Sequence, residues 1–262
     1  MKKILMLAVL LTLISIGAQA TRRAFVIGMP GVESAPITNW QQNTKMVEDA
    51  FREGGYDTQA VYDPGFAYSF PDLDSFLKST SINDDIVIYY SGLYAGEFSS
   101  VFLLPSGFNP AQHKLALDTY NVQRLLNRLR DHNAPLVLIL DLYPRPDFLS
   151  VPQNLAPSLI LKKDRQVAVI NVYDPLTYFT AQEKGIFPKT IAKYISKDTL
   201  LQDKILSWIA KEVDDAAEGA ISPRVLGTID TDSFEGMYEL YAPTKAFDLF
   251  PTEEDGGGSY SF

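Results

Sequence analysis

The sequence contains no cysteine and only two histidines. The absence of cysteine excludes disulfides, thiol catalysis and thiolate metal ligands, so packing alone has to stabilise the fold. Because His113 and His132 are the only imidazoles, metal sites rich in histidine are excluded as well. We therefore expect neither a metal nor a cofactor.

Positive charge is also scarce, with 23 Lys and Arg against 32 Asp and Glu and a net charge of −9. Nucleic acids and anionic membrane surfaces attract proteins through positive charge, so the sequence argues against both as partners. Hydrophobic residues make up 46% of the chain and aromatic residues 12%, which is enough to bury one sizeable core.

The amino terminus reads as an export signal. Lys2 and Lys3 precede an apolar run over residues 4–16, and residues 18–20, Ala-Gln-Ala, form a small-residue cleavage site. The run is shorter than the roughly 20 residues that a membrane-spanning helix needs. The sequence therefore predicts a Sec-type signal peptide over residues 1–20 and a periplasmic or secreted protein, with no membrane span after cleavage.

The rest of the chain alternates apolar runs with helical patterns, which predicts an α/β domain over residues 21–241. Nearly continuous apolar runs at residues 85–91 and 135–142 are typical of central parallel strands. Further strands are expected at residues 23–29, 58–62, 166–173 and 225–229. From residue 242 the composition turns to Pro, Asp, Glu and a triple Gly, which predicts a flexible acidic tail over residues 242–262.

Helices are expected between the strands. Thr38 and Gln41 suggest a capping box for a helix that ends at Gly54. Asp118 is the expected cap of a helix over residues 122–129. Other helices are predicted at residues 73–78, 187–195 and 200–213, the last with Leu201, Ile205, Trp208 and Ile209 on one face.

Two segments at the ends of the central strands resemble known active-site motifs. Residues 89–94 read Tyr-Tyr-Ser-Gly-Leu-Tyr and residues 140–145 read Leu-Asp-Leu-Tyr-Pro-Arg. They resemble the two active-site segments of the caspase and metacaspase superfamily of cysteine peptidases, typically Tyr-Tyr-Ser-Gly-His-Gly and Asp-Ala-Cys-Arg or Asp-Ser-Cys. Residues 22–28, 37–43 and 185–187 with 222–223 are similar to further family segments, so the likeness covers about residues 22–229.

The resemblance implies a caspase-like three-layer sandwich, in which helices flank a mostly parallel central sheet of about six strands. This sequence differs from the family motifs at the positions of the catalytic residues. Leu93 stands at the position of the catalytic His and Tyr143 at that of the nucleophilic Cys, while Tyr94 replaces a Gly. An alkyl side chain accepts no proton, and a phenol without a neighbouring base is a poor nucleophile. We expect a catalytically inactive member that binds a peptide or a protein partner in the cell envelope.

Four residues are the candidate peptide-binding set: Ser91, Tyr94, Asp141 and Tyr143. In family members specific for Arg or Lys, an Asp before the Cys helps to line the specificity pocket, so Asp141 is a candidate partner for a basic side chain. The alternative is a strand-end aspartate satisfied by local hydrogen bonds. Tyr94 and Tyr143 are candidates for an aromatic floor in the former cleft, or alternatively core residues.

Three other interpretations stay open. A hydrolase of a different class would use Ser91 with His113 or His132 as its base. A small-ligand domain would use the Gly-Met-Pro-Gly turn at residues 28–31, although the full glycine fingerprint is missing. Tyr260 and Phe262, after the glycine spacer, suit a partner that captures an extended chain end. Nothing in the sequence indicates an oligomeric state.

Overall fold

The computed structural model describes residues 21–65, 71–97, 100–130, 132, 134, 136–144, 166–172, 185–195, 205–217 and 224–228. The predicted signal peptide, the predicted acidic tail, and Arg145 with Asp147 after the second motif lie outside these residues. All structural statements below concern the described part of the chain.

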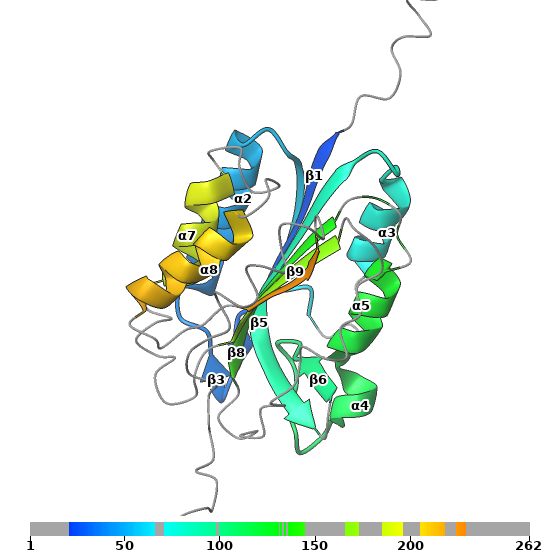
Figure 1. Ribbon diagram of the computed structural model, residues 1–262. Coiled ribbons are helices and arrows are strands. Elements are labelled where there is room, and N and C mark those ends of the chain that lie inside the picture. Colours follow the sequence, from blue (N-terminus) through cyan, green and yellow to red (C-terminus); the bar gives the residue numbers. More distant parts are fainter. Residues whose placement is uncertain are drawn as a thin grey trace, which may run out of the picture.

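A twisted mixed sheet forms the centre of the molecule (Figure 1). Its order is β10 (Arg224–Thr228), β9 (Gln166–Val172), β8 (Leu136–Pro144), β5 (Asp85–Glu97), β1 (Arg22–Gly28) and β4 (Asp57–Tyr62). Neighbours from β4 to β9 pair parallel, and β10 pairs antiparallel with β9. The expected α/β class is therefore confirmed.

Three short additions extend this sheet or lie beside it. β6 (Ser100–Leu103) folds back antiparallel on the far end of β5, and β7 (Tyr120–Asn121) pairs with β6. β2 (Gly31–Val32) and β3 (Ala35–Pro36) form a separate two-stranded hairpin directly after β1. The sequence patterns predicted none of these strands, because pieces of two to four residues show no readable periodicity.

Helices cover both faces of the sheet (Figure 1). α2 (Trp40–Glu53), α7 (Ile186–Ile195) and α8 (Ile205–Ala216) lie on one face; α3 (Pro71–Ser79), α4 (Leu115–Asp118) and α5 (Val122–Arg130) lie on the other. α2 and α7 run in the same direction, because the Asn43 side chain lies against Gly185 near the start of α7, whereas Gly54 lies against Ile195 at its end. Parallel helices follow from parallel strands joined by crossovers.

The core is divided by the sheet into two buried clusters. Strand β5 contributes to both, because successive side chains of a strand point to opposite faces. Val87, Tyr89 and Leu93 belong to the cluster under α2, α7 and α8, which we call the α2-side core. Ile88 and Tyr90 belong to the cluster under α3 and α5, which we call the α5-side core.

Local corrections concern helix ends and one exposed side chain. The cap of α2 is Asn39, in a left-handed conformation with φ of 58° and without a side-chain capping bond, so the Thr38 capping box does not form. Asn121, not Asp118, caps α5, since its Oδ1 accepts a hydrogen bond from the Arg124 amide at 3.1 Å. Trp208 is 54% exposed, whereas Ile209 is buried, so Trp208 does not belong to the core face of α8.

Candidate functional site

The two motif segments lie side by side in the sheet. β5 and β8 pair parallel, with Ser91 opposite Asp141 and Leu93 opposite Tyr143. Leu93 and Tyr143 therefore lie one strand spacing apart. Both strands run past these residues, since β5 continues to Glu97 and β8 to Pro144, so the motif residues lie within strands and not in the loops after them.

A buried carboxylate connects the residues on this face. Asp141 is fully buried, and its Oδ2 accepts hydrogen bonds from the hydroxyls of Tyr143 at 3.0 Å, Tyr89 at 3.3 Å and Ser91 at 3.3 Å. Residues 89, 91, 141 and 143 share one face because residues two apart on a strand point the same way. Burial, together with the charge of Asp141, raises the pKa of Tyr89, so its hydroxyl stays protonated as a donor.

This hydroxyl cluster around Asp141 has limited chemical capacity. A serine nucleophile needs a base to take its proton, and the Asp141 carboxylate already accepts three hydroxyls on one oxygen. Ser91 is 2% exposed and Tyr143 is fully buried, so neither hydroxyl faces solvent. The arrangement satisfies a buried charge with three donors, and each of these bonds is of the charge-assisted kind.

Apolar residues from the β2–β3 hairpin and from the segment after β6 close this end of the sheet. Their members in the α2-side core, which also contains Leu93 and Tyr143, are Val32, Ala35, Ile37, Leu104 and Phe108. The Leu104 amide donates to the Leu93 carbonyl at 3.0 Å, and the Met29 amide donates to the Ser91 carbonyl at 2.9 Å. Leu93 is only 2% exposed as a result, so its side chain is a core residue.

Tyr94 does not join Tyr143. It is 1% exposed and lies in the α5-side core, on the opposite face of the sheet. The structure therefore does not bring these two residues together as an aromatic floor. Tyr89, which alternation places on the same face as Ser91 and Leu93, is the tyrosine that shares Asp141 with Tyr143. Counting the two-residue period of the strand from Leu93 gives this face from the sequence alone.

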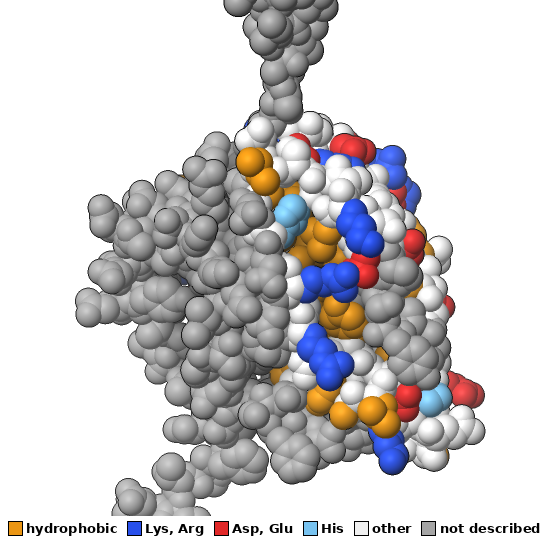
Figure 2. Space-filling model, turned by 90° about the vertical axis from the view of Figure 1, so that its right-hand side faces the viewer, with side chains coloured by type: hydrophobic (Ala, Val, Ile, Leu, Met, Phe, Trp, Pro, Cys, Tyr) orange, Lys and Arg blue, Asp and Glu red, His pale blue; other side chains and the backbone are white. Residues whose placement is uncertain are grey.

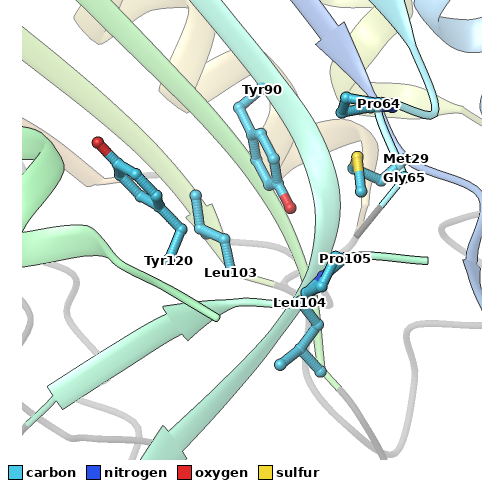
Figure 3. Close-up of a pocket in the computed structure, with 8 residues that line it drawn as sticks. All are labelled: Met29, Pro64, Gly65, Tyr90, Leu103, Leu104, Pro105 and Tyr120. Atoms are coloured by element: carbon cyan, nitrogen blue, oxygen red, sulfur yellow. The ribbon is translucent and has the colours of Figure 1, made fainter. Parts of the chain in front are cut away.

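A small hollow lies after the carboxyl end of β1 and beside the middle of β5, over the α5-side core (Figure 3). It is lined by Met29, Pro64, Gly65, Tyr90, Leu103, Leu104, Pro105 and Tyr120. Its volume of about 10 Å³ leaves room for about one water molecule, so it holds no cofactor-sized ligand. Burial raises the pKa of Tyr90, whose hydroxyl points between Met29 and Leu103 in Figure 3.

The glycine turn after β1 has a structural explanation. Gly28 lies so close to α2 that a Cβ there would fall 2.1 Å from Thr44 Oγ1. Gly31 has a φ of 85°, a conformation that favours glycine, and it begins the β2–β3 hairpin. These roles account for both glycines through packing and turn geometry.

Each histidine has a hydrogen-bond partner other than Ser91, and His132 lies far from Ser91. His132 precedes β8 and its Nε2 lies 2.7 Å from Thr80 Oγ1, just before β5, so the pair marks the amino-terminal edge of the sheet. Burial lowers the pKa of His132. Ser91 is six residues along β5 from Asp85, which is about 20 Å at 3.3 Å per residue. The Nδ1 of His113 accepts a hydrogen bond from the Asn109 amide at 3.0 Å within the segment after β6.

Within the described ranges, no three His, Asp or Glu side chains are grouped so that they could hold a metal ion. Of the helices that the structure describes, none is both long and apolar enough to cross a membrane. Tyr260 and Phe262, the predicted partner-binding residues of the tail, lie outside the described part.

Comparison with known proteins gives information on the fold alone. No family model matches the sequence, and no curated protein matches it. Among solved structures, the chain is similar to a protein from Geobacter sulfurreducens, a structural-genomics target, with a TM-score of 0.54. The alignment covers 81% of this chain and 96% of that chain at 10% sequence identity. At this identity the likeness establishes a shared fold and carries no activity across.

Proposed function

We propose that this chain is an exported, caspase-like domain without a catalytic dyad, which binds a peptide or protein partner at the carboxyl-terminal end of its sheet. The observation that carries the proposal is the register between β5 and β8, in which Leu93 and Tyr143 are direct neighbours. These are the two positions at which the resembling family carries its His and its Cys. Both are filled here by residues of the core.

The arrangement of the sheet supports the finer fold assignment, a caspase-like three-layer sandwich with a mostly parallel sheet. The support consists of four parallel pairings from β4 to β9, one antiparallel strand at the β10 edge, and helices on both faces. In open sheets of this kind, ligands bind outside the carboxyl ends of the strands. The β2–β3 hairpin lies at that end, so a partner there would contact the hairpin first.

Two observations favour binding over hydrolysis. The phenol of Tyr143 is held as a donor to Asp141, so it is not poised to attack a carbonyl. The imidazole of His132 is bonded to Thr80 at the opposite edge of the sheet from Ser91. A hydrolase that uses Ser91 would need a base such as His113 or His132 beside it, and peptide turnover that Ser91→Ala abolishes would establish that alternative.

Site-specific crosslinking tests the binding surface. A photoreactive amino acid replaces Glu33, which is exposed in the turn of the β2–β3 hairpin, in the full chain expressed in its exported form. The matched control replaces Glu53, an exposed residue at the far end of α2 near the amino-terminal edge of the sheet. We expect an adduct from position 33 that is absent from position 53. Equal adducts at both positions, or none at either, would contradict the proposed surface.

Rebuilding the dyad tests the family position of the two residues. Since the chain has no other cysteine, Tyr143→Cys introduces a single thiol whose ionisation can be followed by the ultraviolet absorbance of its thiolate, without a reagent that has to reach the buried position. In Leu93→His/Tyr143→Cys, an imidazole on the neighbouring strand should lower the pKa of that thiol and move its ionisation profile to lower pH. The control is Tyr143→Cys alone. Identical profiles for the two folded variants would show that positions 93 and 143 do not form a dyad geometry.

A further inference from the structure

The two helical faces of the molecule differ in how their cations are paired. On the side of α2, α7 and α8, cations form ion pairs with nearby carboxylates; these include Lys45 with Asp49, Arg52 with Glu48, Lys193 with Glu212 and Lys211 with Asp215. On the side of α3, α4 and α5, the structure gives Lys78, Lys114 and Arg124 no ion pair with any described residue. Figure 2 shows Lys and Arg side chains following one another down this face.

Basic residues recur along this side, with the carboxylates of Asp74 and Asp118 among them. We define the basic face as Lys78, Arg124 and Arg128, with Lys114 beyond them. Arg124 and Arg128 are four residues apart on α5 and therefore neighbours on its surface. Arg128 pairs with Asp74 of α3 at 2.6 Å, and Asp74 lies one turn from Lys78. The nine residues of α5, Val-Gln-Arg-Leu-Leu-Asn-Arg-Leu-Arg, include no acidic side chain.

This basic face is unusual in a chain with a net charge of −9. The negative charge is concentrated in one segment outside the described residues. Residues 229–262 contain eight Asp and Glu and a single Lys, a net charge of −7. The same segment contains seven Phe and Tyr residues. It therefore carries both the charge that complements the basic face and apolar side chains of the kind that add contact area.

Length and attachment make an intramolecular contact feasible. The segment follows β10, and its 34 residues span up to about 110 Å when extended, several times the radius of gyration of about 17 Å expected for a domain of about 200 residues. A covalently attached segment meets its site at an effective concentration of the order of mM, so even weak charge contacts lead to substantial occupancy. We propose that residues 229–262 bind in cis to the basic face.

The expected contact is electrostatic and therefore depends on ionic strength. The Debye length falls from about 30 Å at 0.01 M salt to about 3 Å at 1 M, so exposed charges at this surface are screened at high salt. The bound segment would cover α5 and the end of α3, and it would compete with any other acidic partner for the same surface. The proposal is independent of the function proposed for the carboxyl-terminal end of the sheet.

Paramagnetic NMR on the full chain tests the contact. Because the sequence has no cysteine, Thr252→Cys places a single nitroxide beside the acidic residues at positions 253–255. We expect strong broadening of α3 and α5 amides at 0.01 M salt, and at least a threefold loss of that broadening at 1 M. In Lys78→Glu/Arg124→Glu the broadening should disappear. The matched control, Lys45→Glu/Lys211→Glu, changes net charge equally on the opposite face and should retain it.

Other occupants are recognised by separate outcomes. Broadening that persists when the nitroxide is on unlabelled chains mixed with isotope-labelled ones would mean contact between chains and would overturn the cis proposal. Absence of broadening, combined with binding to vesicles containing 30% phosphatidylglycerol that Lys78→Glu/Arg124→Glu abolishes, would assign the face to anionic lipid. Broadening centred on α2 and α8, or unchanged in Lys78→Glu/Arg124→Glu, would also refute it. Circular dichroism of each variant confirms that the fold is retained.

Discussion

At the scale of single residues, Asp141 combines complete burial with three hydrogen bonds. It is fully buried between two strands and accepts hydrogen bonds from three hydroxyls on one oxygen. A buried charge is tolerated only when it is hydrogen-bonded, and removing the acceptor leaves its donors without their partner. The side chain therefore matters for the fold, whatever it contributes to binding.

The first prediction concerns substitutions at Asp141. Asp141→Ala removes the common acceptor of Tyr89, Ser91 and Tyr143 and should reduce the free energy of unfolding by about 3–5 kcal/mol. Tyr143→Phe removes one donor and should cost about 1–2 kcal/mol. Urea unfolding followed by circular dichroism measures both. A loss below about 1 kcal/mol for Asp141→Ala would mean that the cluster is not a stabilising network.

The same residue decides between the two interpretations of the former specificity pocket. Because the Asp141 carboxylate has no exposed surface, we expect peptides containing Arg or Lys to bind wild type and Asp141→Asn with equal affinity. Fluorescence anisotropy of a labelled peptide measures this. A large loss of affinity in Asp141→Asn, with stability retained, would show that Asp141 binds the basic side chain of the peptide.

A second residue-scale prediction concerns Glu48 on α2. Burial alone would raise the pKa of Glu48, but hydrogen bonds from Tyr62 and Arg52 outweigh it, and the pKa is lowered. A lowered carboxyl pKa stabilises the folded state above the unfolded value, near 4.3, and this contribution is lost as the pH falls through the lower folded value. Glu48→Gln should therefore cost about 1–2 kcal/mol at pH 7, based on its charged hydrogen bonds, and much less at pH 3.

Unfolding by urea at a series of pH values measures this difference. Lys211→Gln serves as the control, because its partner Asp215 is exposed and such surface pairs contribute little. A difference between wild type and Glu48→Gln that stays constant from pH 7 to pH 3 would contradict the assignment.

At the scale of elements, the packing of α2 on β1 depends on one glycine. A Cβ at Gly28 would lie 2.1 Å from Thr44 Oγ1 and 2.8 Å from Thr44 Cβ, and the Thr44 side chain is completely buried. Gly28→Ala should therefore cost about 2–3 kcal/mol through overpacking. Thr44→Ala should relieve part of the clash, so the double variant should lose about 1 kcal/mol less than the sum of the single losses. If the two losses of unfolding free energy measured in urea were strictly additive, α2 would have moved away from β1 in Gly28→Ala and Thr44 would not be the source of the cost.

The sequence predicted those elements whose periodicity is long and regular. Strands β1, β4, β5, β8, β9 and β10 and helices α2, α3, α5, α7 and α8 all overlap the predicted ranges. Strand β5 was predicted to end at residue 91, at the end of the nearly continuous apolar run. It continues to Glu97 because its far end pairs with β6, a contact that no local pattern encodes.

The candidate site was predictable in part for the same reason. Two motifs at the ends of apolar runs place Leu93 and Tyr143 on neighbouring strands, and alternation within each strand places Asp141 beside Tyr143 on one face. The closure of this end of the sheet was not predictable, because the β2–β3 hairpin comes from a turn segment with no apolar periodicity. The burial of Asp141 therefore depends on tertiary contacts, which the sequence patterns do not encode.

At the scale of the whole molecule, the two cores lie on opposite faces of one sheet and share its strands. Ala50 of α2 belongs to the α2-side core, and Ala134, just before β8, belongs to the α5-side core. Strands β1, β5 and β8 contribute alternate side chains to both clusters, so neither can lose its packing while the other stays intact. We therefore expect both cores to unfold in one cooperative transition.

Cysteine protection tests this expectation, since the chain has no natural thiol. Ala50→Cys and Ala134→Cys each place one thiol in a buried position of similar size, 5% and 1% exposed in the native protein. Alkylation of both should remain slow at low urea and become fast at the same urea concentration, matching the midpoint seen by circular dichroism. Gln112→Cys, exposed after β6, should react at all concentrations and serves as the control. A lower midpoint for one buried thiol, with equal global stability of the two variants, would show that its side of the sheet opens independently.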